Sequence, residues 1–180
     1  MATIDLEPRA LADIRLLVLD VDGVLTDGGI FLDADGRELK RFDVHDGAGI
    51  KYWQRTGRQV AVISGRQAAA TLFRAVELGV TAVRQNAKDK LPALESVLEE
   101  LKLTMAQTAV MGDDLPDLPL MLRCALPIAP ANAVEEVRAA ARLVTRRSGG
   151  AGAVREAVEA VLRQTGDWDA LLQRYRKDGA

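Results

Sequence analysis

Two acidic residues stand at the end of a hydrophobic run near the start of the chain. Residues 16–29 read LLVLDVDGVLTDGG, so Asp20 and Asp22 follow four aliphatic residues and are separated by one valine. Two carboxylates brought close together repel each other unless a cation or a proton relieves the repulsion. The spacing therefore indicates a site that binds a cation or moves protons.

Other polar side chains follow other short apolar runs. Ser64 ends VAVIS, Lys90 opens a helical pattern after the next run, and Asp113 follows AVMG. Alternate residues of a strand face the same way, and the carboxyl ends of parallel strands meet at one edge of a sheet. We therefore expect these three side chains to converge with Asp20 and Asp22.

This set of residue types suits phosphoryl transfer. Three carboxylates attract a hard cation, and Mg²⁺ usually binds one or two carboxylates, waters and a phosphate oxygen. Ser64 and Lys90 supply donors for the remaining phosphate oxygens. One aspartate can attack phosphorus to form an aspartyl-phosphate, while a second acid protonates the leaving oxygen and then activates water.

The elements that must position these residues alternate along the chain. We expect strands at residues 15–20, 59–63, 81–84, 108–111 and 124–128, with a weaker one at 142–144. Helical patterns cover residues 69–79, 90–102, 117–124 and 132–143. This alternation predicts an α/β fold, a Rossmann-like doubly wound parallel sheet with helices on both faces.

Two segments depart from the alternation. Residues 28–43 carry apolar side chains around the turn signal Asp35–Gly36 and predict a β-hairpin insertion after the first strand. An isolated hairpin is marginal in water, so we expect it to pack on the body or on another copy of the chain. Residues 165–180 predict a tail, either a loose helix or an extended arm. The spacing leaves no room for a cap domain, so we expect a single domain over residues 1–180.

The composition limits the binding partners and the cellular compartment that we expect for this protein. Hydrophobic residues make up 48% and charged residues 28% of the chain, which is typical of a soluble globular protein. A net charge of -2 offers no excess of cations for nucleic acid, and no long apolar run predicts a membrane span or a signal peptide. The one cysteine, Cys124, fits a reducing, cytoplasmic location.

Four motifs occur in the chain in a fixed order: DVDGVLTDG, ISGR, KDKL and GDDLPD. Together they resemble the motifs of the haloacid dehalogenase superfamily. Over residues 16–156 the chain is similar to the small capless members, in particular the phosphatases of 3-deoxy-D-manno-octulosonate 8-phosphate. The stretches FDVHDGAGIK and RSGGAGAVRE carry this narrower resemblance.

The resemblance implies a role for each matched catalytic residue. Asp20 would be the nucleophile and Asp22 the general acid and base, while Ser64 and Lys90 would hold the phosphoryl group. The Mg²⁺ ligands would be Asp20, the backbone carbonyl of Asp22, and Asp113. Two further acids would orient the site from close by, namely Asp114 and Asp117.

The resemblance also implies a set of substrate contacts. These are Asp22, Asp43, Val44, His45, Asp46, Gly47, Lys51, Arg66, Arg74 and Lys90. Arg66 and Arg74 are eight residues apart, so we expect them on one helix face, where their guanidinium groups would suit a substrate carboxylate. The chain departs from the pattern at His45 and Ala151, where relatives often carry arginine.

The site residues predict a Mg²⁺-dependent phosphatase of a phosphorylated, carboxylate-bearing sugar. The resemblance implies that this substrate is 3-deoxy-D-manno-octulosonate 8-phosphate, which is hydrolysed in lipopolysaccharide precursor biosynthesis. A nine-carbon ulosonate 9-phosphate is an alternative substrate. A receiver-like signalling phosphoacceptor is an alternative of another class, although the Asp-x-Asp pair and the chain length disfavour it. The resemblance further implies a homotetramer in which the hairpins and tails of neighbours close each open site against water.

Overall fold

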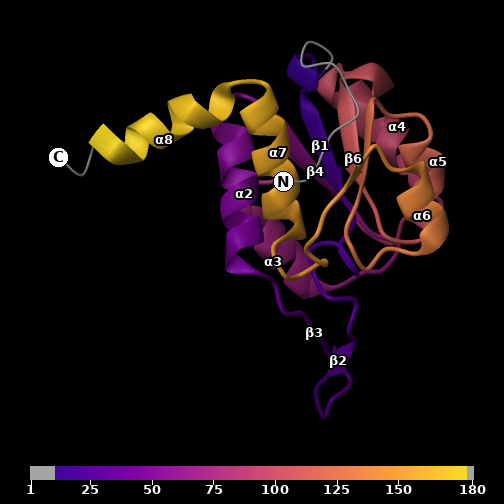
Figure 1. Cartoon of the computed structure of the whole chain (residues 1–180). Coiled ribbons are helices and arrows are strands. Elements are labelled where there is room, and N and C mark those ends of the chain that lie inside the picture. The colour runs from indigo at the N-terminus through magenta and orange to yellow at the C-terminus, as the bar shows by residue number, and fades with distance from the viewer. Residues whose placement is uncertain (1–10, 178–180) are drawn as a thin grey trace.

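The computed structural model describes residues 11–177 of the chain. Its centre is a sheet of parallel strands in the order β5-β4-β1-β6-β7-β8 (Figure 1). The strands are β1 (Leu16–Leu19), β4 (Gln59–Ile63), β5 (Ala82–Arg84), β6 (Thr108–Met111), β7 (Leu126–Ala129) and β8 (Leu143–Val144). The six expected strands and the doubly wound α/β architecture are confirmed, and the strand order reverses between β1 and β6.

Helices cover both faces of this sheet (Figure 1). One face carries α2 (Val44–Arg55), α3 (Ala69–Leu78), α7 (Ala153–Gln164) and α8 (Asp167–Lys177). The other carries α4 (Lys90–Leu101), α5 (Leu118–Met121) and α6 (Glu135–Ala140), with short 3₁₀ turns at Met105–Gln107 and Leu115–Asp117. A hydrophobic core lies on each face of the sheet: the first core is formed with α2 and α7, and the second with α4 and α5. Leu17 and Leu19 of β1 point into the first core, and Leu16 and Val18 point into the second, as strand alternation requires.

Helix α7 was not among the helices predicted above, although its sequence carries a helical signal. Its buried residues recur in adjacent pairs four residues apart: Ala153 and Val154, Ala157 and Val158, and Val161 and Leu162. This spacing gives one broad apolar stripe. The stripe packs into the first core beside α2.

The expected hairpin projects from the body below the sheet (Figure 1). It consists of β2 (Phe31–Leu32) and β3 (Glu38–Leu39), which pair antiparallel over two residues each. Its apolar side chains are about half exposed: Ile30, Phe31, Leu32 and Leu39. Only the hairpin and α2 separate β1 from β4, so this gap holds no cap domain.

The tail forms a helix rather than an extended arm. Trp168 near the start of α8 is 4% exposed, and its ring lies 4.8 Å from the Arg163 guanidinium and 5.5 Å from that of Arg155. Arg155 also stacks 4.6 Å from the Tyr52 ring of α2. These cation–π contacts between arginines and aromatic rings hold α8 against α2 and α7. Residues 178–180 of the predicted tail, and residues 1–10, lie outside the described part.

Two remaining expectations concern membrane-spanning helices and the single cysteine. Within residues 11–177, no helix combines the length and the apolar character that crossing a bilayer requires. Cys124 is a free, largely buried thiol that donates to the Met121 carbonyl at 3.3 Å. Burial raises the pKa of this thiol to about 12, so it is chemically inert near neutral pH.

Candidate active site

Of the residues expected to converge, Asp20, Lys90 and Asp113 meet where the order of strands reverses. Asp20 follows β1, and its backbone N–H donates to the Met111 carbonyl of the neighbouring β6 at 3.1 Å. Asp113 lies two residues beyond β6. In doubly wound sheets, ligands bind in the crevice at this reversal.

Three carboxylates and one ammonium group meet there, and we call them the acidic cluster: Asp20, Asp113, Asp117 and Lys90. One oxygen from each carboxylate lies within 4.8 Å of the other two. Lys90 Nζ contacts Asp20 Oδ1 at 2.8 Å and Asp117 Oδ1 at 2.7 Å. Lys90 is the first residue of α4, and its side chain is 5% exposed.

The cluster holds more negative charge than Lys90 neutralises. Burial, together with Asp20 and Asp117, raises the pKa of Asp113 to about 8. Burial and Asp117 raise the pKa of Asp20 to about 6, with Lys90 acting in the opposite direction. Asp113 Oδ1 is buried and has no hydrogen-bond partner among the described residues. A buried oxygen without a partner is unfavourable, so the cluster has the electrostatics and the hard ligands that fit a divalent cation.

Two glycines allow these carboxylates to approach the backbone. Gly23 has a φ of +90°, and a Cβ there would overlap the Asp113 carboxylate. A Cβ on Gly112 would overlap Asp117. Asp117 in turn accepts from the backbone N–H groups of Asp113 at 3.1 Å and Asp114 at 3.4 Å. Asp117 is therefore fixed in place, whereas Asp114 is exposed and caps the 3₁₀ turn.

Asp22 pairs with two cations outside the acidic cluster, Lys40 and Arg66. Its Oδ1 accepts from Lys40 Nζ at 2.5 Å, and its Oδ2 lies 3.8 Å from Arg66 Nε. Lys40 and its second partner, Glu38, were not predicted as site residues. The available signal was their spacing: residues two apart on a strand share a face, so both charges of this hairpin strand point inward together.

Ser64 lies at the same sheet edge, directly after β4. It is 3% exposed, and its hydroxyl accepts from the Arg66 backbone N–H at 3.2 Å. Its own N–H donates to the Arg84 carbonyl of β5. Hydrogen bonds thus hold Ser64 against β5 and close to Arg66, whose side chain lies beside Asp22.

The expectation that Arg66 and Arg74 share a helix face is wrong. Helix α3 begins at Ala69, so Arg66 lies in the turn before it and reaches Glu38 of the hairpin at 2.8 Å. Arg74 lies within α3, donates to Glu77 at 2.8 Å, and has a buried Nε with no described partner. The two guanidinium groups therefore have different partners: Arg66 pairs with Glu38, and Arg74 pairs with Glu77.

The acidic side chains at the start of α2 mainly cap helices. Asp43 caps the helix by accepting from the N–H groups of His45 and Asp46. Asp46 is 1% exposed, and its two oxygens accept from Gly152 at 3.1 Å and Arg155 at 2.9 Å. Both oxygens of Asp46 therefore hold the first turn of α7.

The other expected contacts on α2 are spread around the helix. Val44 and His45 are exposed at its first turn. Gly47 is buried, and a Cβ there would overlap the Arg74 guanidinium. The Lys51 ammonium group lies beside Gly79, which ends α3.

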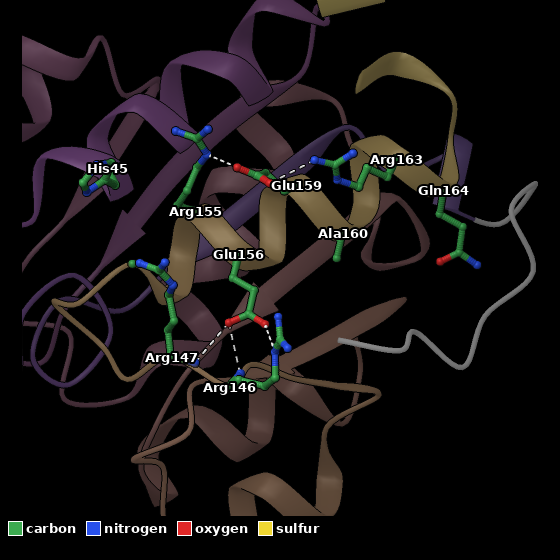
Figure 2. Close-up of a pocket in the computed structure, with 10 residues that line it drawn as sticks. His45, Arg146, Arg147, Arg155, Glu156, Glu159, Ala160, Arg163 and Gln164 are labelled. Atoms are coloured by element: carbon green, nitrogen blue, oxygen red, sulfur yellow. Dashed lines mark hydrogen bonds and ion pairs between the residues drawn. The ribbon is translucent and has the colours of Figure 1, made fainter. Parts of the chain in front are cut away.

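A groove of about 700 Å³ runs along α7, and His45 lines its end (Figure 2). Figure 2 shows its charged walls: Arg146 pairs with Glu156, while Arg155 and Arg163 both pair with Glu159. No member of the acidic cluster lines this groove. The charges along it are mostly satisfied by each other, unlike those of the acidic cluster.

The chain matches known phosphatases along most of its length. Residues 79–157 match the family model of haloacid dehalogenase-like hydrolases. The 3-deoxy-D-manno-octulosonate 8-phosphate phosphatase KdsC of Escherichia coli K12 is 43% identical over 157 residues, which are 87% of this chain and 84% of the relative. The chain belongs to the KdsC family of haloacid dehalogenase-like hydrolases.

Solved structures of KdsC-type phosphatases have the same fold. The 3-deoxy-D-manno-octulosonate 8-phosphate phosphatase of Moraxella catarrhalis, in complex with magnesium, phosphate and KDO, is 36% identical with a TM-score of 0.90, covering 93% of this chain and 97% of that one. The cobalt-bound enzyme of Haemophilus influenzae is 38% identical with a TM-score of 0.84, covering 87% and 92%. The resemblance to the capless haloacid dehalogenase family is confirmed.

Proposed function

We infer that this chain is a phosphatase that converts 3-deoxy-D-manno-octulosonate 8-phosphate to 3-deoxy-D-manno-octulosonate and phosphate, a step in lipopolysaccharide precursor biosynthesis. The substrate follows from membership of the KdsC family. The observation that carries the chemistry is the acidic cluster at the strand reversal, with its unpartnered Asp113 oxygen. A divalent cation resolves that excess of negative charge and can bind an oxygen of a phosphate ester at the same time.

Mg²⁺ is the cofactor, and the donor set of the acidic cluster fits it. We propose that Asp20, Asp113 and the backbone carbonyl of Asp22 hold the ion. When bound, Mg²⁺ neutralises charge on the phosphoryl oxygens and orients the phosphoryl group. Asp117 and Asp114 serve by fixing the loop after β6, as their backbone hydrogen bonds indicate.

The side chains of the site suggest two successive displacements at phosphorus. An Asp20 carboxylate oxygen attacks phosphorus, the bond to the sugar oxygen breaks, and Asp22 gives its proton to that oxygen. Asp22, now a carboxylate, takes a proton from water, and the water oxygen attacks phosphorus to release phosphate and restore Asp20. Lys90 and Ser64 hold the phosphoryl oxygens during both steps.

The arginines before and within α3 are proposed contacts for the substrate carboxylate. Arg66 and the half-buried Arg74, whose Nε has no hydrogen-bond partner among the described residues, each offer the planar fork that binds carboxylates. For Asp46 we propose a supporting role, because both of its oxygens cap α7. Substrate contacts at Asp43, Val44, His45, Gly47 and Lys51 stay predictions.

We propose that the active form is a homotetramer whose hairpins and tails contact neighbouring subunits. The half-exposed apolar residues of the hairpin support this, as does a second apolar surface on α3 formed by Leu72, Phe73 and Val76. Light scattering at working concentration tests it, and a monomer there would overturn it. We further propose one domain over residues 1–180 and, from the biosynthetic substrate and the lone thiol, a cytoplasmic location.

Phosphate release across a substrate panel tests the proposed function. The panel contains the eight-carbon and nine-carbon ulosonate phosphates, glucose 6-phosphate and p-nitrophenyl phosphate, each with Mg²⁺ and with excess EDTA. We expect a strong, metal-dependent preference for the eight-carbon compound. Preference for the nine-carbon compound would overturn the substrate, and a stable phospho-protein without turnover would favour a receiver-like phosphoacceptor.

A further inference from the structure

The hairpin delivers a buried lysine to the proposed acid and base of the reaction. Lys40 follows β3, and its side chain is 2% exposed, although its hairpin neighbours are largely open to solvent. Its Nζ lies 2.5 Å from Asp22 Oδ1 and 2.6 Å from Glu38 Oε1. A buried ammonium group is unfavourable unless it is paired, so these two carboxylates determine where Lys40 lies.

Arg66 completes a closed arrangement of alternating charge, which we call the charge ring: Asp22, Lys40, Glu38 and Arg66. Arg66 donates to Glu38 Oε2 at 2.8 Å, and its Nε lies 3.8 Å from Asp22 Oδ2. Hydrogen bonds from Arg66 and then Lys40 hold the pKa of Glu38 below its usual range. When Asp22 is ionised, the two positive and two negative groups balance; in the first step of the proposed reaction Asp22 is instead protonated. Glu38 and Lys40 are the two members that come from the hairpin.

The ring holds the two oxygens of Asp22 differently. Oδ1 is tied to Lys40 by a short contact, whereas the ion pairs within residues 11–177 place only the more distant Arg66 beside Oδ2. One oxygen is thus anchored, and the other is left able to give or accept a proton. The Asp22 side chain is 23% exposed, so it can still meet a substrate.

We propose that Lys40 is a positioning residue that orients Asp22 for proton transfer to and from the reacting oxygens. The proposal rests on the proposed function, in which Asp22 gives its proton to the sugar oxygen as the phosphorus–oxygen bond breaks. Glu38 holds Lys40 in turn, so the hairpin takes part in the chemistry as well as in subunit contact. Neither Lys40 nor Glu38 needs to touch the substrate.

The role of Lys40 should depend on the leaving group. A sugar alkoxide leaves poorly without a proton, so its release needs a well-oriented acid, which typically contributes about 10²–10⁴-fold. A p-nitrophenolate group leaves without that proton. Loss of Asp22 orientation should therefore slow the sugar phosphate much more than p-nitrophenyl phosphate.

Lys40→Met tests this in the full chain with Mg²⁺. We expect kcat for the eight-carbon ulosonate phosphate to fall at least about tenfold more than kcat for p-nitrophenyl phosphate, with KM changed less than about twofold. Asp22→Asn should shift the ratio of the kcat values for the two substrates in the same direction. Lys40→Arg should restore part of the ratio, because it returns a cation to Asp22.

Arg41→Met is the matched control, since it removes one positive charge from the next hairpin residue. Arg41 is exposed and contacts only Asp27, at 3.8 Å, among the ion pairs of the described chain. It should leave the substrate ratio unchanged. Retained activity on p-nitrophenyl phosphate shows that Lys40→Met is folded, and Glu38→Gln provides a second, milder disturbance of the same ring.

Three results would overturn the inference: an equal loss on both substrates, a change confined to KM, or no change in Lys40→Met. These differ from failure of the proposed function. In that case the wild-type protein itself would not prefer the eight-carbon compound, whatever the behaviour of the Lys40 variants.

Discussion

Asp20 and Asp22 lie two residues apart but belong to regions with different electrostatics. Asp20 is in the acidic cluster, where three carboxylates share one ammonium group, and its pKa rises to about 6. Asp22 is in the charge ring, where two carboxylates face two cations. Different surroundings give one residue type different tasks. The cluster is built to receive a cation, while the ring is already neutral and orients a side chain.

The largest loss of activity should follow from removal of the nucleophile in the acidic cluster. Asp20→Asn takes away the attacking oxygen, so we expect kcat/KM for the sugar phosphate to fall at least about 10³-fold. The fold should persist, because a repelled charge is removed. Asp27→Asn makes the same change on the exposed side of this loop and should retain activity. More than a tenth of wild-type phosphate release in Asp20→Asn would refute the assignment.

Removal of the metal should have the next largest effect. With EDTA we expect phosphate release to fall to background, and added Mg²⁺ should restore it and raise Tm by several degrees, since the ion binds only the folded cluster. Asp113→Asn should lose most of the Mg²⁺-dependent rise in Tm and about 10²-fold in activity. Glu135→Gln, on exposed α6, should retain both. An unchanged Mg²⁺ effect in Asp113→Asn would exclude Asp113 as a ligand.

The pH dependence of stability should distinguish the two regions in metal-free protein. Folding raises the pKa of Asp113 from 3.8 to about 8, so its contribution to stability is complete below about pH 4 and is lost as the pH rises through about 8. Folding lowers the pKa of Glu38 from 4.5, so its contribution is present above that pH and is lost in acid.

We therefore expect the Tm of EDTA-treated protein to fall as the pH rises from about 4 to about 8. Asp113→Asn should reduce this slope, whereas Glu38→Gln should lower Tm above about pH 4.5 and leave Tm at the acid end of the profile nearly unchanged. Thermal unfolding followed by circular dichroism across this pH range measures both. A slope unaffected by Asp113→Asn would mean that the cluster carries no excess charge.

The sequence predicted the acidic cluster better than the charge ring, for a physical reason. Asp20 and Asp113 follow strands, and a parallel sheet brings strand ends together whatever the loops do. Lys40 and Glu38 come from a hairpin, whose position against the body depends on tertiary packing. The shared helix face expected for Arg66 and Arg74 rested on their spacing alone, and Arg66 lies before Ala69, where α3 begins.

The role of Asp46 was hidden for a similar reason. Its place in the sequence, between Asp43 and Gly47, matched a substrate-contact pattern. Its partners, Gly152 and Arg155, are more than a hundred residues away. A capping contact between two helices becomes visible only after the chain has brought α7 against α2.

The arginine and aromatic stack that fastens α8 gives the protein two separate optical reporters. Trp53 is buried in the core with Arg58 stacked 5.2 Å from its ring, and Trp168 lies between Arg155 and Arg163 at the base of the tail. These are the only tryptophans in the chain. Fluorescence of a Trp53→Phe variant would therefore follow docking of the tail without an added label, and a Trp168→Phe variant would follow the core.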